Sequence, residues 1–115
     1  MAGAPDMKLV KAIIREERVP YVQKALADRN IYGMTVSSVM GRGSQGGIYL
    51  QFRGGILNID LLPKAAIEMV IHNDQEEIVI NQILSAARLG KEGDGKIFVM
   101  PVHEAYRVRT GEVEV

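Results

Sequence analysis

The order of apolar and polar residues predicts a strand, a helix and a strand in the first third of the chain. Residues 7–15 form a short apolar run with several β-branched side chains, which favours a strand. Glu16 and Glu17 favour a helix start because carboxylates suit the positive end of the helix dipole, and apolar residues then recur at helical spacing as far as Leu26. Residues 34–40 alternate imperfectly and predict a second strand.

The second half of the chain repeats this order. Pro63 is expected to close a long loop, and residues 65–71 predict a third strand. Asn73 or Asp74 can cap the next helix, and residues 97–102 predict a fourth strand. Between them lies an apolar stripe with the spacing of one helix face, formed by Val79, Ile80, Ile83, Leu84 and Ala87.

Two successive strand–helix–strand units predict an α+β fold of the ferredoxin-like type, βαββαβ. Its sheet is antiparallel, both helices lie on one face, and a long loop joins the second and third strands. A sheet with one face in water should alternate cleanly between apolar and polar residues, and these strands do not. We therefore expect subunit contacts over the second face and a symmetric oligomer. The strand residues that lead to this expectation are Val10, Ile13, Ile14, Val36, Val39, Met69, Val70, Phe98 and Val99.

Composition narrows the classes of function. The 14 basic and 14 acidic residues cancel, which argues against a nucleic-acid coat or a polybasic membrane binder. Cysteine is absent and the only histidines are His72 and His103, so thiol chemistry and a histidine-rich metal site are excluded. No run approaches the ~20 apolar residues of a membrane span, and no secretory signal is visible. We expect one cytoplasmic domain over residues 7–115, with residues 1–6 as a leader.

Two glycine-rich segments are candidate sites. Six of the 12 glycines lie between Gly41 and Gly55. Residues 41–58 predict a long flexible loop of the kind that carries function, or alternatively a strand extension that can order itself. The second segment, 90-GKEGDGK-96, suits a polyanion because glycines expose backbone N–H groups and the lysine adds a charge. It follows a helix, whereas a P-loop precedes one, and taken alone it fits a helix stop and a turn better.

Other candidates are weaker when each is taken alone. Arg107 and Arg109 would point to the same side of an extended segment and suit a polyphosphate, although they also fit two solvated tail residues. Lys64 can meet a carboxylate, and Gln45 can offer an oxygen to Mg²⁺. Neither histidine has the partners of a catalytic triad, and a phosphate-handling enzyme would lack a nucleophile. An RNA-recognition module would need aromatic residues within 65–71, and that strand has none.

Six short segments give the chain a resemblance to the PII family of signal-transduction proteins, which sense nitrogen, carbon and energy state. They follow the family's order and spacing from Met7 onward: 33-GMTV-36, 41-GRGSQGG-47, 53-RG-54, 60-DLLPK-64, 93-GDGKIFV-99 and 107-RVRTGE-112. The GRG-x-QGG form is most similar to the branch that includes archaeal members associated with ammonium channels. The resemblance implies a regulator and not an enzyme.

The resemblance further implies a homotrimer that binds ATP or ADP in clefts between neighbouring subunits. Its phosphate loop would lie in one subunit, and two arginines would reach the phosphates from the next. The nucleotide-binding residues implied are Ile13, Thr35 and Val70 around the adenine, Gly41 and Gly43, the phosphate loop Gly93, Asp94, Gly95 and Lys96, and the arginines Arg107 and Arg109.

It also implies an effector site and a loop that grips targets. Gln45 would coordinate Mg²⁺ together with the ATP phosphates and 2-oxoglutarate. A carboxylate of 2-oxoglutarate would pair with Lys64, helped by backbone N–H groups of residues 43–47, which include Gly46 and Gly47. Residues 42–58 correspond to the T-loop of the family. Within it the resemblance assigns partner binding to Tyr49, Phe52 and Arg53.

The implied target is a membrane transporter, either an ammonium channel or a similar protein. Arg53 matches the loop-tip arginine that enters the channel pore in channel-binding members. The alternative target is a nitrogen-metabolism enzyme such as nitrogenase or glutamine synthetase, or an arginine-pathway kinase. Neither target involves nucleic acid or direct membrane insertion, so we expect a cytoplasmic protein that a transporter recruits to the membrane.

Four positions depart from the family pattern. Leu57 stands where classical bacterial members carry a uridylylated tyrosine, so this modification is not expected. Gly55 stands where some cyanobacterial members carry a modified serine. Ser44 replaces a common basic residue, and Leu89 replaces the usual threonine before the phosphate loop. These two positions bear on contact with the γ-phosphate and on the preference between ATP and ADP.

Overall fold

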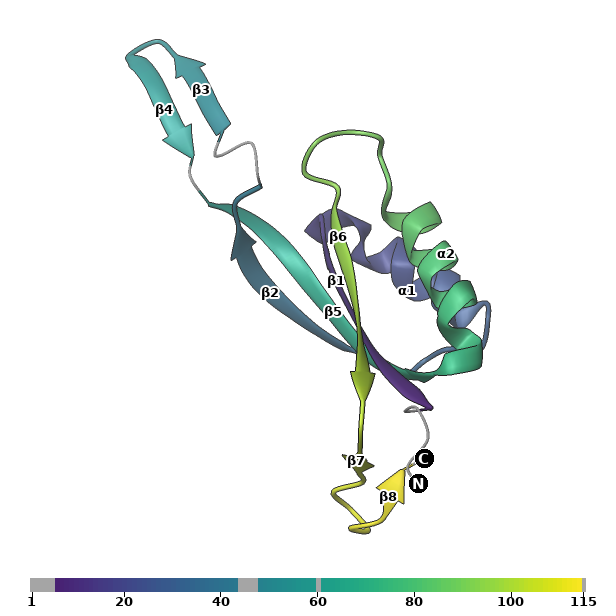
Figure 1. Cartoon of the computed structure of the whole chain (residues 1–115). Helices are drawn as coiled ribbons and strands as arrows, with labels where there is room; N and C mark the ends of the chain where they lie inside the picture. The colour runs from purple at the N-terminus through teal and green to yellow at the C-terminus, as the bar shows by residue number, and fades with distance from the viewer. Residues whose placement is uncertain (1–5, 44–47, 60, 115) are drawn as a thin grey trace.

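A four-stranded antiparallel sheet, covered on one face by two helices, forms the body of the protein (Figure 1). The computed structural model describes residues 6–43, 48–59 and 61–114, with the backbone alone for 48–52 and 57–59. The order of the strands is β2-β5-β1-β6, which is the predicted ferredoxin-like arrangement. The elements of this body are β1 (Met7–Ile14), α1 (Val19–Ala27), β2 (Thr35–Gly41), β5 (Leu62–His72), α2 (Glu76–Ala87) and β6 (Gly95–Val102).

Strand β1 lies in the middle of the sheet, paired with β5 on one side and β6 on the other. Its residues Val10, Ala12 and Ile14 are at most 2% exposed, because alternate side chains of a strand point to the same face and this face meets the helices. Burying a large aliphatic side chain of this kind stabilises the fold by roughly 1.5–3 kcal/mol. The helix residues in the same core are Val22, Leu26, Val79 and Ile83.

Each helix is entered through one turn of 3-10 helix, Glu16–Arg18 (η1) and Asn73–Gln75 (η2). Asn73 and Asp74, the expected caps of α2, lie inside η2, so that expectation is wrong. The backbone N–H of His72 donates to Oε1 of Gln75 at 3.0 Å. The Gln75 side chain therefore ties the beginning of the helical segment back to the end of β5.

The open face of the sheet carries apolar side chains around one polar pair. Val70, Phe98 and Met100 are 47%, 47% and 42% exposed. Lys11 and Glu68 form an ion pair of 3.5 Å across β1 and β5 on the same face. Both faces of the sheet are thus rich in apolar residues, as the imperfect alternation predicts.

A β-hairpin occupies part of the stretch for which the sequence predicts a flexible loop. Strands β3 (Ile48–Phe52) and β4 (Gly55–Ile59) pair antiparallel and project beyond the end of the sheet (Figure 1). Their pairing leaves a two-residue turn at the tip. The T-loop segment therefore contains regular structure of its own.

Two further expectations need correction. Pro63 does not close the loop but lies within β5, opposite Met40 of β2. A proline is tolerated there because β1 pairs with β5 only from Ala65 onward, which leaves one side of β5 unpaired at this point. The C-terminal segment, for which no strand was predicted, forms a small hairpin of β7 (Ala105–Tyr106) and β8 (Val113–Glu114).

Gly95, the first residue of β6, has no room for a side chain. Its φ is 106°, and an added Cβ would overlap the carbonyl oxygen of Ile13. We expect Gly95→Ala to lower the free energy of unfolding by about 2 kcal/mol or more, measured by denaturant unfolding. Gly33→Ala is the control, because a Cβ on Gly33 meets nothing within 4 Å and its effect should stay within about 0.5 kcal/mol. Equal losses in the two variants would contradict this steric argument.

Candidate functional site

The loop over residues 88–94, between α2 and β6, is organised around the carboxylate of Asp94. Its Oδ2 accepts hydrogen bonds from the backbone N–H groups of Leu89, Gly90 and Lys91 at 3.1, 2.8 and 3.3 Å. Gly90 has a left-handed φ of 81°, which costs glycine little. One side chain thus closes the turn that precedes β6.

Hydrogen bonds keep Asp94 ionised. Partial loss of hydration raises the pKa of its carboxyl, but the hydrogen bonds from Gly90, Arg15, Leu89 and Lys91 outweigh that effect and set the pKa below its ordinary value. The carboxylate is therefore a permanent acceptor at neutral pH, and its negative charge is partly matched by the Arg15 guanidinium.

Two cations approach this loop from neighbouring strands of the sheet. Arg15, which follows β1, donates from Nη2 to the carbonyl oxygen of Glu92 at 2.5 Å and from Nε to Oδ1 of Asp94 at 3.2 Å. Lys64 of β5 donates from Nζ to the carbonyl oxygen of Gly93 at 2.5 Å. The loop is thus held from within the protein by two positive charges.

The environment of Lys64 favours an anion. Burial lowers the pKa of Lys64, and the nearby Arg15 charge lowers it further, while the carboxylates of Glu17 and Asp94 offset only part of this shift. A ligand carboxylate beside Lys64 would replace the lost hydration with an opposite charge and stabilise the charged ammonium.

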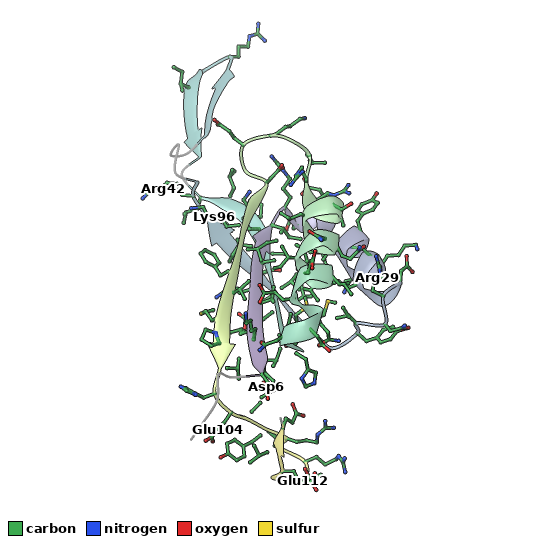
Figure 2. The ribbon with its side chains drawn as sticks, turned by 45° about the vertical axis from the view of Figure 1, so that its right-hand side comes forward. Asp6, Arg29, Arg42, Lys96, Glu104 and Glu112 are labelled. Carbon is green, nitrogen blue, oxygen red and sulfur yellow. The ribbon has the colours of Figure 1, made fainter. Side chains whose placement is uncertain are left out.

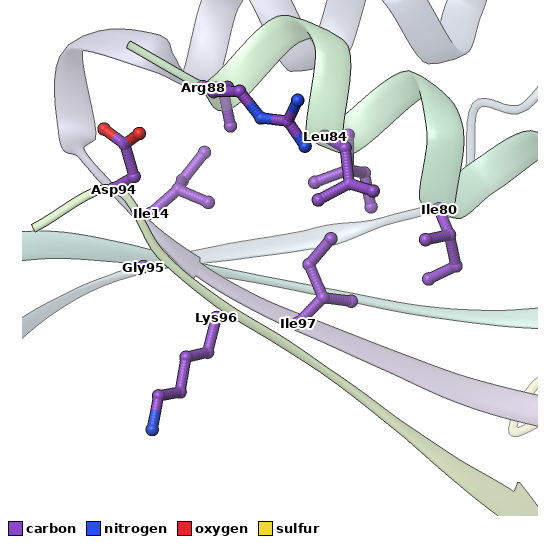
Figure 3. Close-up of a pocket in the computed structure, with 10 residues that line it drawn as sticks. Ile14, Ile80, Leu84, Arg88, Asp94, Gly95, Lys96 and Ile97 are labelled. Carbon is purple, nitrogen blue, oxygen red and sulfur yellow. The ribbon is translucent and has the colours of Figure 1, made fainter. Parts of the chain in front are cut away.

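Lys96 points away from these internal contacts. It lies opposite Ile13 of β1, and alternation along β6 places Gly95 and Ile97 toward the helices and Lys96 toward the open side. Figure 3 shows its side chain directed away from Ile97 and from the helix. The side chain of Lys96 is therefore exposed on the open side of the sheet.

A cavity of about 410 Å³ lies on the helix side of β6 (Figure 3). Its lining is mainly apolar, with the charged residues Arg88, Asp94 and Lys96 among its walls. Asp94, Gly95 and Lys96 of the predicted phosphate loop therefore border this cavity, although the side chain of Lys96 is directed away from Ile97 (Figure 3). The apolar residues that line it are Ile14, Ile80, Ile83, Leu84, Ala87 and Ile97.

The remaining candidate residues lie at the other end of the sheet. Thr35 and Val70 line one cavity of about 360 Å³, and Val70 and Arg107 line another of about 270 Å³. The guanidinium of Arg107 pairs with the carboxylate of Glu114 at 2.8 Å. Figure 2 shows this C-terminal segment, labelled at Glu112, far from Lys96 along the molecule.

The geometry expected for the arginine pair is wrong. The segment after Arg107 turns instead of extending, because the backbone N–H of Gly111 donates to the carbonyl oxygen of Arg107 at 2.7 Å. Period-two alternation therefore does not relate Arg107 to Arg109. A glycine with a left-handed φ of 73° at position 111 permits this tight turn.

The candidate residues fall into two groups, and the length of strand β5 gives the distance between them. Lys64 and Val70 lie six residues apart on it, which corresponds to roughly 20 Å at about 3.3 Å per residue. The group at the loop end comprises Ile13, Gly41, Lys64, Gly93, Asp94, Gly95 and Lys96, and the group at the opposite end comprises Thr35, Val70, Arg107 and Arg109.

The structure describes part of the predicted T-loop, residues 42–58. Gln45, Gly46 and Gly47 lie outside the described residues. Gly43 is exposed two residues beyond the end of β2, and the backbones of Tyr49 and Phe52 belong to β3. Arg53 is exposed in the turn between β3 and β4. The predicted partner-binding arginine therefore stands at the tip of the hairpin.

Sequence analysis missed Arg15 and Glu114. The position of Arg15 directly after the first strand is a usable signal, because antiparallel pairing brings that end of β1 beside the start of β6. Glu114 has no comparable signal, since a single acidic residue in a tail predicts no partner.

Comparison with known proteins identifies close relatives. The sequence pattern of the family described as "Nitrogen regulatory protein P-II" matches residues 7–112. Nitrogen regulatory protein P-II of Microchaete diplosiphon is 44% identical over 92% of this chain and 95% of its own length. Nitrogen regulatory protein P-II 2 of Methanothermobacter thermautotrophicus is 46% identical over 92% of both chains.

A solved structure has the same fold. Arabidopsis thaliana PII bound to citrate matches with a TM-score of 0.78 and 40% sequence identity, over 96% of this chain and 90% of its own. In the part of the chain that the structure describes, helices are too short or too polar to cross a membrane.

The lowered pKa of Asp94 predicts how the loop responds to acid. A carboxyl group whose pKa is lowered in the folded state stabilises the fold at pH values above its ordinary pKa of about 4. This stabilisation is lost as the pH falls through the lowered pKa of the folded state. We expect unfolding curves of wild type and Asp94→Asn to differ at pH 7 and to converge as pH falls through the lowered pKa of Asp94. Glu92→Gln, which neutralises an exposed carboxylate of the same loop, should match wild type throughout this range. A constant difference across this range would refute the assigned role of the charge.

Proposed function

The chain belongs to the PII family of nitrogen regulatory signal-transduction proteins, and from this premise we propose that it senses ATP and ADP in clefts between the subunits of a homotrimer. Members of this family are regulators and not enzymes, and trimers are typical of it. Nucleotide and 2-oxoglutarate binding are known for the family. We propose further that the protein controls a membrane transporter through its T-loop.

The observation that carries the proposal is the distance between the two groups of candidate residues. The glycine loop with Lys96 and the segment with Arg107 lie at opposite ends of one sheet. A triphosphate tail is far shorter than this separation, so no single chain can bring both groups to one nucleotide. Two adjacent copies can, if the loop end of one lies beside the opposite end of the next.

The open face of the sheet supports assembly. Val70, Phe98 and Met100 are each more than 40% exposed in the single chain. Covering apolar area of this kind stabilises association by about 25 cal/mol per Å² before the costs of binding are subtracted. A trimer that buries this face would explain why both faces of the sheet are apolar.

The effector proposed is 2-oxoglutarate, held by Lys64 and by the backbone of the T-loop. The support is the local charge, since Lys64 is a partly buried cation with a second cation nearby. The Arabidopsis relative is described as bound to citrate, another small polycarboxylate. Gln45 would supply an oxygen to Mg²⁺, which would bridge the phosphates and the keto acid. ADP lacks the γ-phosphate and would hold this arrangement less well, so phosphate number would shift the loop between conformations.

The target proposed is a membrane transporter such as an ammonium channel. A long arginine side chain at the tip of a projecting hairpin suits insertion into a narrow pore, and Arg53 occupies that tip. An enzyme of nitrogen metabolism is the alternative target, which would be bound by the broader surface of the same hairpin.

Lys96→Ala should raise the dissociation constant for ATP at least tenfold, because a charge-assisted contact to phosphate contributes about 1.5–3 kcal/mol. Titration calorimetry measures the affinity, and light scattering should show an unchanged trimer mass. Lys91→Ala removes an exposed lysine of the same loop and should leave the affinity unchanged.

Mixed trimers test whether the site is shared between subunits. Subunits with Lys96→Ala and subunits with both Arg107→Ala and Arg109→Ala should each bind ATP poorly as homotrimers. In a trimer that contains both kinds, one cleft combines an intact loop with intact arginines, so one ATP per mixed trimer should bind with near-native affinity. No recovery would show that the site is not shared in this way.

Arg53→Ala tests the target. We expect at least tenfold weaker binding to vesicles that carry an ammonium channel, measured by co-sedimentation, with nucleotide affinity unchanged. Arg29→Ala, an exposed arginine beyond α1, is the control and should bind as wild type does. Undiminished binding by Arg53→Ala would exclude pore insertion, and binding to glutamine synthetase or nitrogenase in its place would favour the enzyme target.

A further inference from the structure

Two cations hold neighbouring residues of the α2–β6 loop, and only one of them has a role in the proposed function. The guanidinium of Arg15 donates to the carbonyl oxygen of Glu92 at 2.5 Å and to Oδ1 of Asp94 at 3.2 Å. The ammonium of Lys64 donates to the carbonyl oxygen of Gly93 at 2.5 Å. Consecutive residues of the loop are therefore tied to the residue that follows β1 and to strand β5.

These two cations differ in how firmly they are engaged. The planar fork of Arg15 is used at two points, and the side chains of its ion pair with Asp94 are only 23% and 24% exposed. Lys64 holds one carbonyl oxygen, and its ammonium has further N–H donors. Burial and the charge of Arg15 lower the pKa of Lys64, so its charged form gains from an approaching anion. An anion therefore recruits Lys64 more readily than Arg15.

Recruitment of Lys64 changes what holds the loop. The carbonyl oxygen of Gly93 loses its donor, and Gly93, with a left-handed φ of 90°, has no side chain to anchor it. What remains is the hydrogen bond from Arg15 to Glu92, a backbone hydrogen bond of 3.3 Å from the N–H of Asp94 to the carbonyl oxygen of Lys91, and the carboxylate of Asp94. The N–H groups of Leu89, Gly90 and Lys91 depend on this carboxylate. Arg15 is the side chain that binds the other oxygen of this carboxylate.

We propose that Arg15 is a positioning residue of the candidate site. Its guanidinium fixes Glu92 and Asp94, so that the loop keeps its phosphate-receiving shape after Lys64 leaves Gly93 for a ligand carboxylate. Arg15 touches neither ligand and acts through Asp94. It thereby couples the two sites, because without it a carboxylate at Lys64 would loosen the loop that holds the phosphates. The identity of the two ligands rests on the proposed function, whereas the fixing of the loop does not.

Arg18 provides a matched control on the same segment of the chain. Its guanidinium also anchors a carbonyl oxygen, that of Ala86, with hydrogen bonds of 2.9 and 2.7 Å, and it stacks over the ring of Tyr21. Arg18→Gln therefore removes the same charge and a comparable anchor, but at the end of α2 and not in the loop.

Hydrogen exchange of the ligand-free protein tests the fixing of the loop directly. In Arg15→Gln the amides of Leu89, Gly90 and Lys91 should exchange about tenfold faster or more, because their acceptor is no longer held. In Arg18→Gln these amides should exchange as in wild type. Unchanged exchange in Arg15→Gln, or equal acceleration in both variants, would overturn the proposal.

Calorimetry with MgATP, with and without 2-oxoglutarate, tests the coupling. In Arg15→Gln the effect of 2-oxoglutarate on ATP affinity should fall about tenfold relative to wild type, with no such fall in Arg18→Gln. Arg15→Lys should restore only part of the coupling, because an ammonium lacks the fork that reaches two acceptors. Full restoration by lysine would show that charge alone suffices and would overturn the positioning role.

The two sets of measurements separate the two proposals. If wild type binds no nucleotide while the loop amides of Arg15→Gln exchange faster, the proposed function fails and the positioning of the loop stands. If wild type binds both ligands and the exchange is unchanged in Arg15→Gln, the proposed function stands and the role of Arg15 is wrong.

Discussion

The pairing of β1 with both β5 and β6 decides where the charges of the candidate site lie. Because β5 and β6 both run antiparallel to β1, the end of β1 lies beside the beginning of β5 and the beginning of β6. Arg15, Lys64 and the loop before Gly95 therefore meet, although they are far apart in sequence. The register that buries Val10 and Ile14 under the helices is the same register that brings these groups together.

The same sheet also keeps the rest of the proposed site away. A strand is nearly inextensible at about 3.3 Å per residue, so residues at the two ends of β5 cannot approach one another by any loop movement. Val70 and Arg107 are thus confined to the end opposite the glycine loop. A site that needs both ends has to be completed by another copy of the chain, and the exposed apolar side chains of the open face give that copy a reason to associate.

Most of the fold could be predicted from the sequence, because each element of the sheet carries its own periodic signal. Val79, Ile83 and Ala87 are buried as the helical stripe predicts, and β1 covers nearly the predicted residues. What could not be predicted depends on contacts between distant segments. The hairpin of β3 and β4, the place of Pro63 within β5 and the turn after Arg107 all lack a local pattern strong enough to indicate them.

The candidate site shows the same division between side-chain pattern and backbone geometry. The motif around Gly93 and Lys96 is visible as a string of residue types, but its anchoring by Arg15 appears only when the strands are paired. Leu89 shows that a change of side chain can leave the backbone geometry unchanged. It lacks the hydroxyl group that a threonine would bring, yet its backbone N–H still donates to Asp94 at 3.1 Å. Because the turn is closed by main-chain donors, this departure from the family pattern leaves the shape of the loop intact and removes only a side-chain hydroxyl next to it.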